Sequence, residues 1–189
     1  MVCRESQVNF DSTYSFGSYD GALQQLIQLF KYGKIETLAG PLSKLLLRAA
    51  PLNEQFDAII PMPLHWRKRW QRGFNQTELL ARPVAKRYGL RLSKALGRTR
   101  YTQPQAGLTD TERRKNLKGS FVVRRPDEVR GRRILLIDDV FTTGATLRSA
   151  TKILKEAGAT RVTALTLARV DKRSAPAVAA VEPKLTGVS

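Results

Sequence analysis

The chain has 189 residues, a length that fits one domain with a single continuous core. Its hydrophobic content of 42% excludes a disordered chain, and its longest apolar runs fall far short of the ~20 residues of a membrane-spanning helix. No secretory signal is readable at the start, so we expect a cytoplasmic protein without a membrane partner. The formal net charge of +17 favours phosphates, nucleic acid or other anions as partners.

The positive charge is concentrated in the middle of the chain. The net charge is 0 over residues 1–56, +12 over 57–130 and +5 over 131–189. A solvated basic face explains any single cluster about as well as a binding site does. The densest clusters are Arg67, Lys68, Arg69 and Arg72, followed by Arg113, Arg114 and Lys115.

Hydrophobic periodicity predicts four helices and four strands along the chain. Pro83 lies inside the third predicted helix and predicts a kink or break there, while Asn75 is placed to cap that helix. The expected helices cover residues 22–32, 38–50, 76–88 and 147–157, and the expected strands cover 56–60, 121–123, 133–137 and 162–168.

The last strand, helix and strand are joined by short links and form a right-handed crossover unit. The fold class is therefore α/β, with a mainly parallel, twisted sheet flanked by helices. The polar, aperiodic stretch 100–118 predicts a long loop. We expect an N-terminal segment over residues 1–20, the main domain over 21–169 and a flexible tail over 170–189.

The stretch from Ile134 to Thr146 joins a buried-type strand to two carboxylates, Asp138 and Asp139, and to a hydroxyl-rich loop that opens a helix. Backbone N–H groups at a helix N-terminus bind phosphate, and Gly144 lets the backbone come close. The carboxylates suit a sugar diol and Mg2+ held through water. A simpler alternative is that these side chains only cap local N–H groups. The G-x-x-x-x-G-K-[ST] motif of nucleotide hydrolases is absent from the sequence.

At Ile134–Thr146 the sequence resembles the phosphoribosyl pyrophosphate (PRPP) signature of type I phosphoribosyltransferases. Further stretches resemble the ComF (ComFC/GntX) branch of competence-associated proteins, and the resemblance runs from about residue 19 to residue 169. It implies the type I phosphoribosyltransferase fold with a small N-terminal hood region. The hood is the part of such proteins that closes over the site, and we assign residues 10–21 and 98–121 to it. The stretches are Phe56–His65, Arg72–Gln76, Gln105–Leu108 and Arg113–Asn116.

The resemblance also implies a Mg2+-dependent displacement of pyrophosphate from PRPP, with Asp138, Asp139 and Arg113 as catalytic residues. Asp138 and Asp139 would hold Mg2+ through water. His65 is equally well explained as a packing partner of Trp66. The expected contacts of the ribose 5-phosphate are Asp138, Asp139, Thr142, Thr143, Gly144, Ala145 and Thr146, and those of the pyrophosphate are Pro63, Leu64, His65 and Arg72.

Two functions fit these features. One is a phosphoribosyltransferase with an unidentified acceptor, and the other is a competence factor that binds single-stranded DNA and keeps the PRPP pocket as a sensor or relic. Expected partners are PRPP and single-stranded DNA or DNA-uptake proteins, and the sequence leaves open whether the chain forms a homodimer. The residues expected to contact nucleic acid are Arg67, Lys68, Arg69 and Arg114.

Members of the ComF branch often begin with a four-cysteine zinc ribbon. Zinc needs about four nitrogen or sulfur ligands, whereas this chain offers Cys3 and a distant His65. We therefore expect no zinc in this chain, with residues 1–20 as the remnant of a lost ribbon.

Overall fold

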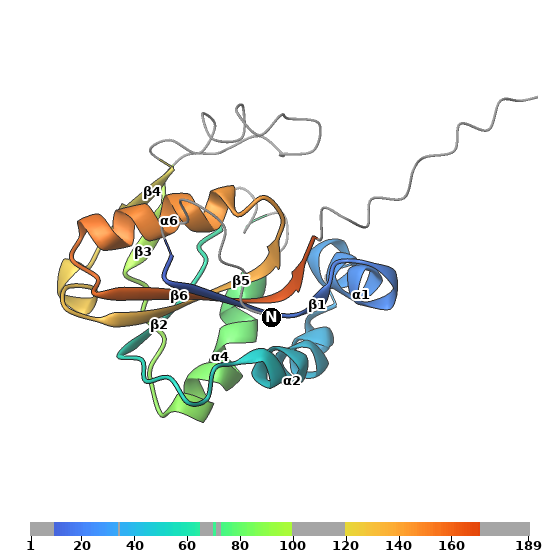
Figure 1. Ribbon diagram of the computed structural model, residues 1–189. Coiled ribbons are helices and arrows are strands. Elements are labelled where there is room, and N and C mark those ends of the chain that lie inside the picture. Colours follow the sequence, from blue (N-terminus) through green and yellow to red (C-terminus); the bar gives the residue numbers. More distant parts are fainter. Residues whose placement is uncertain (1–9, 34, 65–69, 71–72, 100–119, 171–189) are drawn as a thin grey trace, which may run out of the picture.

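The computed structural model describes residues 10–33, 35–64, 70, 73–99 and 120–170 (Figure 1). Within them, a four-stranded parallel sheet has the order β1-β6-β5-β2. The expected α/β class, with a parallel sheet flanked by helices, is confirmed. The strands are β1 (Ser12–Ser18), β2 (Ala58–Pro61), β5 (Arg133–Phe141) and β6 (Arg161–Arg169).

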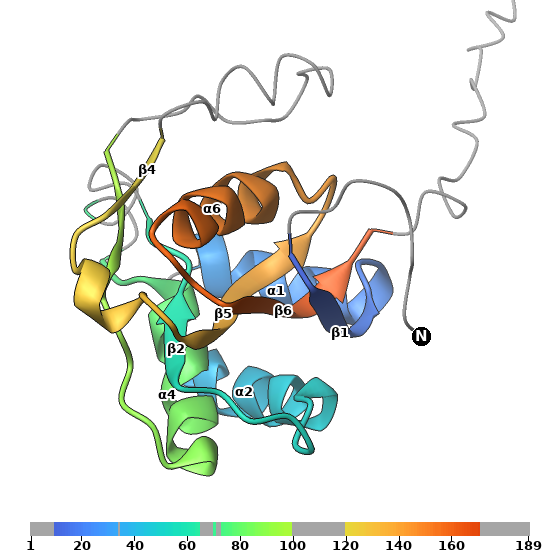
Figure 2. The same ribbon diagram turned by 60° about the vertical axis from the view of Figure 1, so that its left-hand side comes forward.

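Helices cover both faces of this sheet, with α6 on one face and α2 and α4 on the other (Figures 1 and 2). Neighbouring residues of β5 point to opposite faces, so Ile134 and Leu136 pack with α6 whereas Leu135 and Ile137 pack with α2 and α4. All four are fully buried, which explains the continuous apolar run in the sequence. The helices are α1 (Gly21–Tyr32), α2 (Ala39–Ala49), α4 (Gln76–Tyr88) and α6 (Ala145–Glu156).

A second, two-stranded antiparallel sheet consists of β3 (Leu96–Arg98) and β4 (Phe121–Val123). The sequence predicted β4 but not the short β3. The expected long loop at 100–118 lies outside the described residues, as do residues 1–9 and the expected tail from 171 onward. Two single-turn helices complete the described chain, η1 (Glu36–Leu38) and η2 (Pro126–Glu128). No described helix has both the length and the apolar character needed to cross a membrane.

The structure differs from the sequence predictions at the N-terminal strand. Residues 10–21 were expected in the hood, but Ser12–Ser18 pairs along β6 as an edge strand of the main sheet (Figure 2). Its residues are mostly half-buried and largely polar, so the strand lacks the apolar signal of the central strands.

The third predicted helix does not break at Pro83. Proline removes one backbone hydrogen bond, yet α4 continues to Tyr88 because Leu80 and Val84 on its inner face are fully buried. The helix ends at Gly89 as expected, and the φ angle of 66° at this residue explains why glycine is found there.

Candidate functional site

Asp138 and Asp139 lie near the carboxyl end of β5, a central strand of the parallel sheet. The sequence placed them in a loop, but β5 continues through both residues to Phe141 because Asp138, Val140 and Phe141 stay in register with β6. Both residues are largely but not completely buried, and the Asp138 Oδ1 atom accepts a hydrogen bond from the Asp139 backbone N at 2.9 Å. The carboxyl end of such a sheet is where ligands bind in open α/β folds.

A tight loop connects this acid pair to α6. Gly144 has φ of 70°, and a Cβ atom there would lie 2.8 Å from Phe141 Cζ, so the loop requires glycine. Arg148 donates a hydrogen bond to the Thr143 carbonyl, and the Ala145 backbone N lies 3.4 Å from Thr143 Oγ1. The N-cap residue Gly144 has no side chain to cap α6, and the long contact from Thr143 engages the first backbone N of the helix. The first-turn N–H groups of this helix are therefore suited to an anion.

The segment after β2 lies next to the acid pair, because Pro61 is in register with Ile137 of β5. Met62 extends this pairing, since its backbone N donates to the Ile137 carbonyl at 2.8 Å. Pro63 and Leu64, two of the residues expected to contact pyrophosphate, follow directly and are partly buried. The structure thus brings the first part of the expected pyrophosphate loop beside the acid pair.

The N-terminus of α4 holds this segment in place. The carbonyl of Met62 accepts hydrogen bonds from Thr77 Oγ1 at 2.6 Å and from Asn75 Nδ2 at 3.3 Å. Asn75 is the N-cap residue, as the sequence predicted, but its side chain makes no capping hydrogen bond. The amide instead fixes the segment after β2, a role that depends on a contact between distant parts of the chain.

The remaining predicted site residues cannot be placed relative to the acid pair. They fall in the stretches 65–69, 71–72 and 100–119, which lie outside the described residues. Their expected roles stay predictions. These residues are His65, Arg67, Lys68, Arg69, Arg72, Arg113 and Arg114.

Lys31 of α1 is a site residue that the sequence analysis missed. Its Nζ atom lies 2.9 Å from Asp139 Oδ1, and the exposed fractions of the two side chains are 16% and 15%. The sequence contained a weak signal for this position. Lys31 follows the fully buried Ile27 by one helical turn, so it lies on the inner side of an amphipathic helix. A lysine at such a position needs an anionic partner.

The charged side chains around the acid pair shift the pKa values of Asp138 and Lys31. Burial and the adjacent Asp139 charge raise the pKa of Asp138 well above its usual range, although the positive charges of Lys31 and Arg98 oppose that rise. Burial alone would lower the pKa of Lys31, but the charge and hydrogen bond of Asp139 raise it above its usual value. The acid pair is therefore influenced by two positive charges from different elements, Lys31 of α1 and Arg98 of β3.

Arg98 is the second of these cations and comes from β3. Its guanidinium carbon lies 5.3 Å from the centre of the Phe121 ring, so β4 supports it through a cation–π contact. Burial lowers the pKa of Arg98, and the charge of Asp138 opposes that shift. The small sheet thus brings a positive charge toward the acid pair.

The acid pair fits a magnesium ion. Carboxylate oxygens are the protein ligands that Mg2+ prefers, and this ion usually binds through one or two carboxylates, water and substrate phosphates. The described part of the chain contains no cluster of three or more His, Cys, Asp or Glu side chains that could hold a metal by itself. Asp138 and Asp139 would accordingly supply the protein share of a site completed by water and diphosphate.

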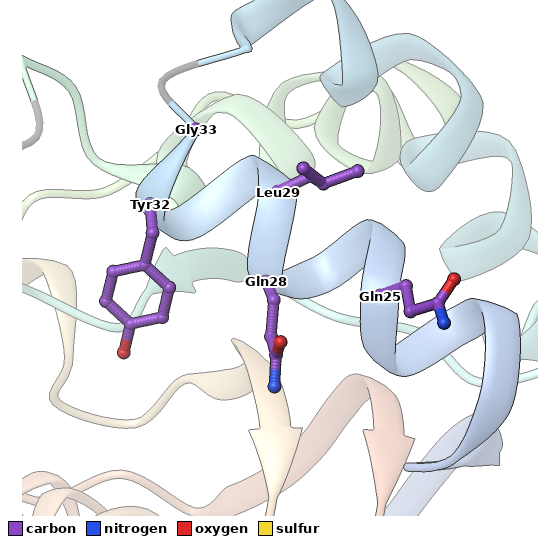
Figure 3. Close-up of a pocket in the computed structure, with 5 residues that line it drawn as sticks. All are labelled: Gln25, Gln28, Leu29, Tyr32 and Gly33. Atoms are coloured by element: carbon purple, nitrogen blue, oxygen red, sulfur yellow. The ribbon is translucent and has the colours of Figure 1, made fainter.

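Residues at the C-terminal half of α1 and the following Gly33 line a hollow (Figure 3). Tyr32 and Leu29 are 72% and 48% exposed there, so the hollow is open to solvent. None of its described lining residues belongs to the predicted site. These residues are Gln25, Gln28, Leu29, Tyr32 and Gly33.

A family model for the phosphoribosyl transferase domain matches residues 18–181. This match covers strands β2, β5 and β6 of the parallel sheet, the acid pair and the loop that precedes α6. The chain therefore belongs to the phosphoribosyltransferase-domain family.

Named relatives place the chain in the ComF branch. It is 34% identical over 175 residues to "Competence protein F" of Haemophilus influenzae, a match that covers 88% of this chain and 76% of the relative. It is also 34% identical over 174 residues to "DNA utilization protein YhgH" of Escherichia coli O6:H1, with the same two shares. The resemblance stated from the sequence is confirmed.

A solved structure that is similar to this chain is that of "the allosteric regulatory enzyme of purine biosynthesis". The TM-score is 0.47 at 20% sequence identity, and the match covers 69% of this chain and 25% of that one.

Proposed function

We propose that this protein binds PRPP with Mg2+ and transfers its phosphoribosyl group to an acceptor. The observation that carries the proposal is the arrangement of one continuous segment. The acid pair of β5 is followed there by the Gly144 turn and by the N-terminus of α6, whose N-cap residue provides no side-chain cap. A ribose phosphate needs acceptors for its diol and N–H donors for its 5-phosphate. This segment offers both, and membership in the phosphoribosyltransferase-domain family supports the assignment.

In the proposed reaction the bond from C1 of the ribose to pyrophosphate breaks, and pyrophosphate leaves with the electron pair. The acceptor supplies the pair for the new bond at C1. Asp138 and Asp139 orient the ribose hydroxyls and oppose the positive charge that develops on the sugar ring. Bound Mg2+ would neutralise negative charge on the leaving pyrophosphate. Catalysis would therefore consist mainly of positioning and electrostatic stabilisation.

Isothermal titration with PRPP in excess Mg2+ tests the proposal. Replacing both carboxylates, Asp138→Asn with Asp139→Asn, is expected to weaken PRPP binding about 10- to 100-fold, because charged hydrogen bonds to the diol and the Mg2+ contact are lost. Asp127→Asn, an exposed aspartate on η2, is the matched control and should bind like the wild type. The absence of PRPP binding by the wild-type protein would overturn the proposal.

A pyrophosphate-release assay then addresses the acceptor. Nucleobases, amines and single-stranded DNA are the acceptor classes to supply with PRPP and Mg2+. Release that depends on one class identifies the acceptor chemistry. Binding of PRPP without release in any of the mixtures would favour a PRPP-binding protein over a transferase.

A second candidate function is binding of single-stranded nucleic acid, as the sequence analysis proposed. The observation in its favour is a row of exposed basic side chains on α4 and on the segment that leads to β3. The names of the relatives, which refer to competence and DNA utilization, support this candidate as well. The residues of this basic row are Arg82, Lys86, Arg87, Arg91 and Lys94.

A further inference from the structure

We propose that Lys31 is a positioning residue that divides the acid pair into two roles. Its ammonium holds Asp139 against α1, which leaves Asp138 as the carboxylate that serves the ribose and the metal. The inference rests on the proposed PRPP site and deepens it. The sequence led us to expect that both carboxylates hold Mg2+ through water. The inference assigns this role to Asp138 and a supporting role to Asp139.

The contact is short and largely shielded from water. Lys31 Nζ lies 2.9 Å from Asp139 Oδ1, and both side chains are about five-sixths buried, with exposed fractions of 16% and 15%. Removing one partner of such a pair leaves a charge that is poorly solvated, so the two groups constrain each other strongly. The carboxylate of Asp139 is therefore fixed by α1 as well as by its own strand.

The helix that carries Lys31 is itself firmly anchored. Ile27 and Phe30 have no exposed surface and pack in the same core cluster as Leu135 and Ile137 of β5. The lysine stem thus starts from a fixed backbone position beside the strand it contacts. This geometry differs from an exposed ion pair, in which two long side chains move freely.

The two carboxylates differ in the partners that surround them. Asp139 has an ammonium in direct contact, whereas the part of the chain described by the structure gives the Asp138 side chain only the Asp139 N–H as a hydrogen-bond donor. Direct contact with Lys31 occupies Asp139 Oδ1, whereas Lys31 and Arg98 act on Asp138 by longer-range charge, so Asp138 is the carboxylate better placed to receive an added cation. Lys31 therefore directs the metal and the diol toward Asp138.

A double-variant cycle on PRPP affinity in excess Mg2+ tests this inference. Lys31→Met and Asp139→Asn are each expected to weaken PRPP binding about 10-fold, the effect expected when a group that orients a ligand-binding side chain is removed. If Lys31 acts through Asp139, the double variant should be no weaker than Asp139→Asn alone. Lys31→Arg keeps the positive charge and should retain more affinity than Lys31→Met.

Lys155→Met is the matched control, because Lys155 forms an ion pair of similar length with Asp11, 2.8 Å, on a different part of the molecule. Its PRPP affinity should equal that of the wild type, and thermal unfolding reports whether each variant is folded. If Lys31→Met does not fold, the PRPP affinities of Lys31→Arg and Asp139→Asn are compared instead. A 10-fold loss of PRPP affinity in Lys31→Arg would then overturn the inference.

Further outcomes would also overturn the inference. Losses that multiply in the double variant would mean that Lys31 contacts the ligand itself. Wild-type affinity in Lys31→Met, or an equal loss in Lys155→Met, would show that Lys31 has no specific role. If the wild-type protein binds no PRPP, the proposed function fails first, and the inference falls with it.

Discussion

Gly144 shows how a single residue shapes the candidate site. In the loop between β5 and α6, a Cβ atom at this position would lie 2.8 Å from Phe141 Cζ, so a larger residue would force the Phe141 ring to move. The positive φ of 70° adds a second reason for glycine. The sequence predicted a glycine-containing loop before this helix, and the crowding by Phe141 became visible only in three dimensions.

We predict that Gly144→Ala lowers the free energy of unfolding by about 1–3 kcal/mol, because alanine is strained at a positive φ and crowds Phe141. It should also weaken PRPP binding by displacing the N-terminus of α6. Urea unfolding and titration calorimetry measure the two effects. Gly40→Ala is the control, since a Cβ at Gly40 of α2 meets no atom within 4 Å and alanine favours helix. Equal stability of both variants would contradict the prediction.

At the scale of elements, polar contacts connect strands and helices at the two ends of the sheet. Near the carboxyl end, Asn75 and Thr77 of the α4 N-terminus bind the segment after β2. At the amino end, Asp57 just before β2 accepts hydrogen bonds from the Arg133 side chain at 3.0 and 2.9 Å and from its backbone N at 2.8 Å. Sequence periodicity predicts the elements but not these links, because a polar side chain carries no signal of its distant partner.

The Asp57–Arg133 contact predicts a pH dependence of stability. The hydrogen bonds from Arg133 lower the pKa of Asp57 from 3.8 to about 2. A carboxylate whose pKa is lowered in the folded state stabilises the fold above its unfolded pKa, and this contribution is lost as the pH falls from about 4 toward 2. Because the Arg133 side chain is 42% exposed, the contribution is about 1 kcal/mol or less.

Urea unfolding of the wild-type protein and of Asp57→Asn between pH 2 and pH 7 checks this prediction. The variant should be less stable at neutral pH, and the difference should shrink toward pH 2. Asp20→Asn, an exposed aspartate before α1, is the control with little effect. A stability difference that does not change with pH would contradict the assigned role of the carboxylate charge.

At the scale of the whole molecule, charge is the dominant property. The net charge is +17, and a single PRPP site uses only a few cations. Some of the surplus lies on α4 and its continuation, on the face of the sheet opposite α6 (Figure 1). Exposed basic residues on one face of a molecule are typical of surfaces that bind nucleic acid backbones.

If single-stranded DNA binds along α4, affinity should fall with salt at a slope of about 0.7 per phosphate contacted in a plot of log affinity against log salt. Replacing Lys86 and Arg87 with alanine should lower that slope by about 1.4. Lys152→Ala on α6 is the control, because this lysine is 65% exposed on the other face of the sheet. Binding titrations at several salt concentrations provide the slopes. Affinity that is undetectable at low salt would exclude this function.

The sequence alone determined the features that depend on neighbouring residues. The acid pair, the Gly144 turn and the strand-helix-strand unit from β5 to β6 occupy one continuous stretch, so local periodicity and composition were sufficient to find them. The extents of the helices followed for the same reason, apart from the kink or break expected at Pro83, where α4 continues to Tyr88 because its inner face is buried.

Only the tertiary structure decided which distant side chains meet. Lys31 reaches Asp139, Arg98 approaches Asp138 from the small sheet, and Ser12–Ser18 joins the main sheet as an edge strand. Such contacts depend on how elements pack, and packing brings together residues whose local sequence gives no hint of the pairing. The sequence therefore indicated the candidate site, and the fold brought Lys31 into contact with its acid pair.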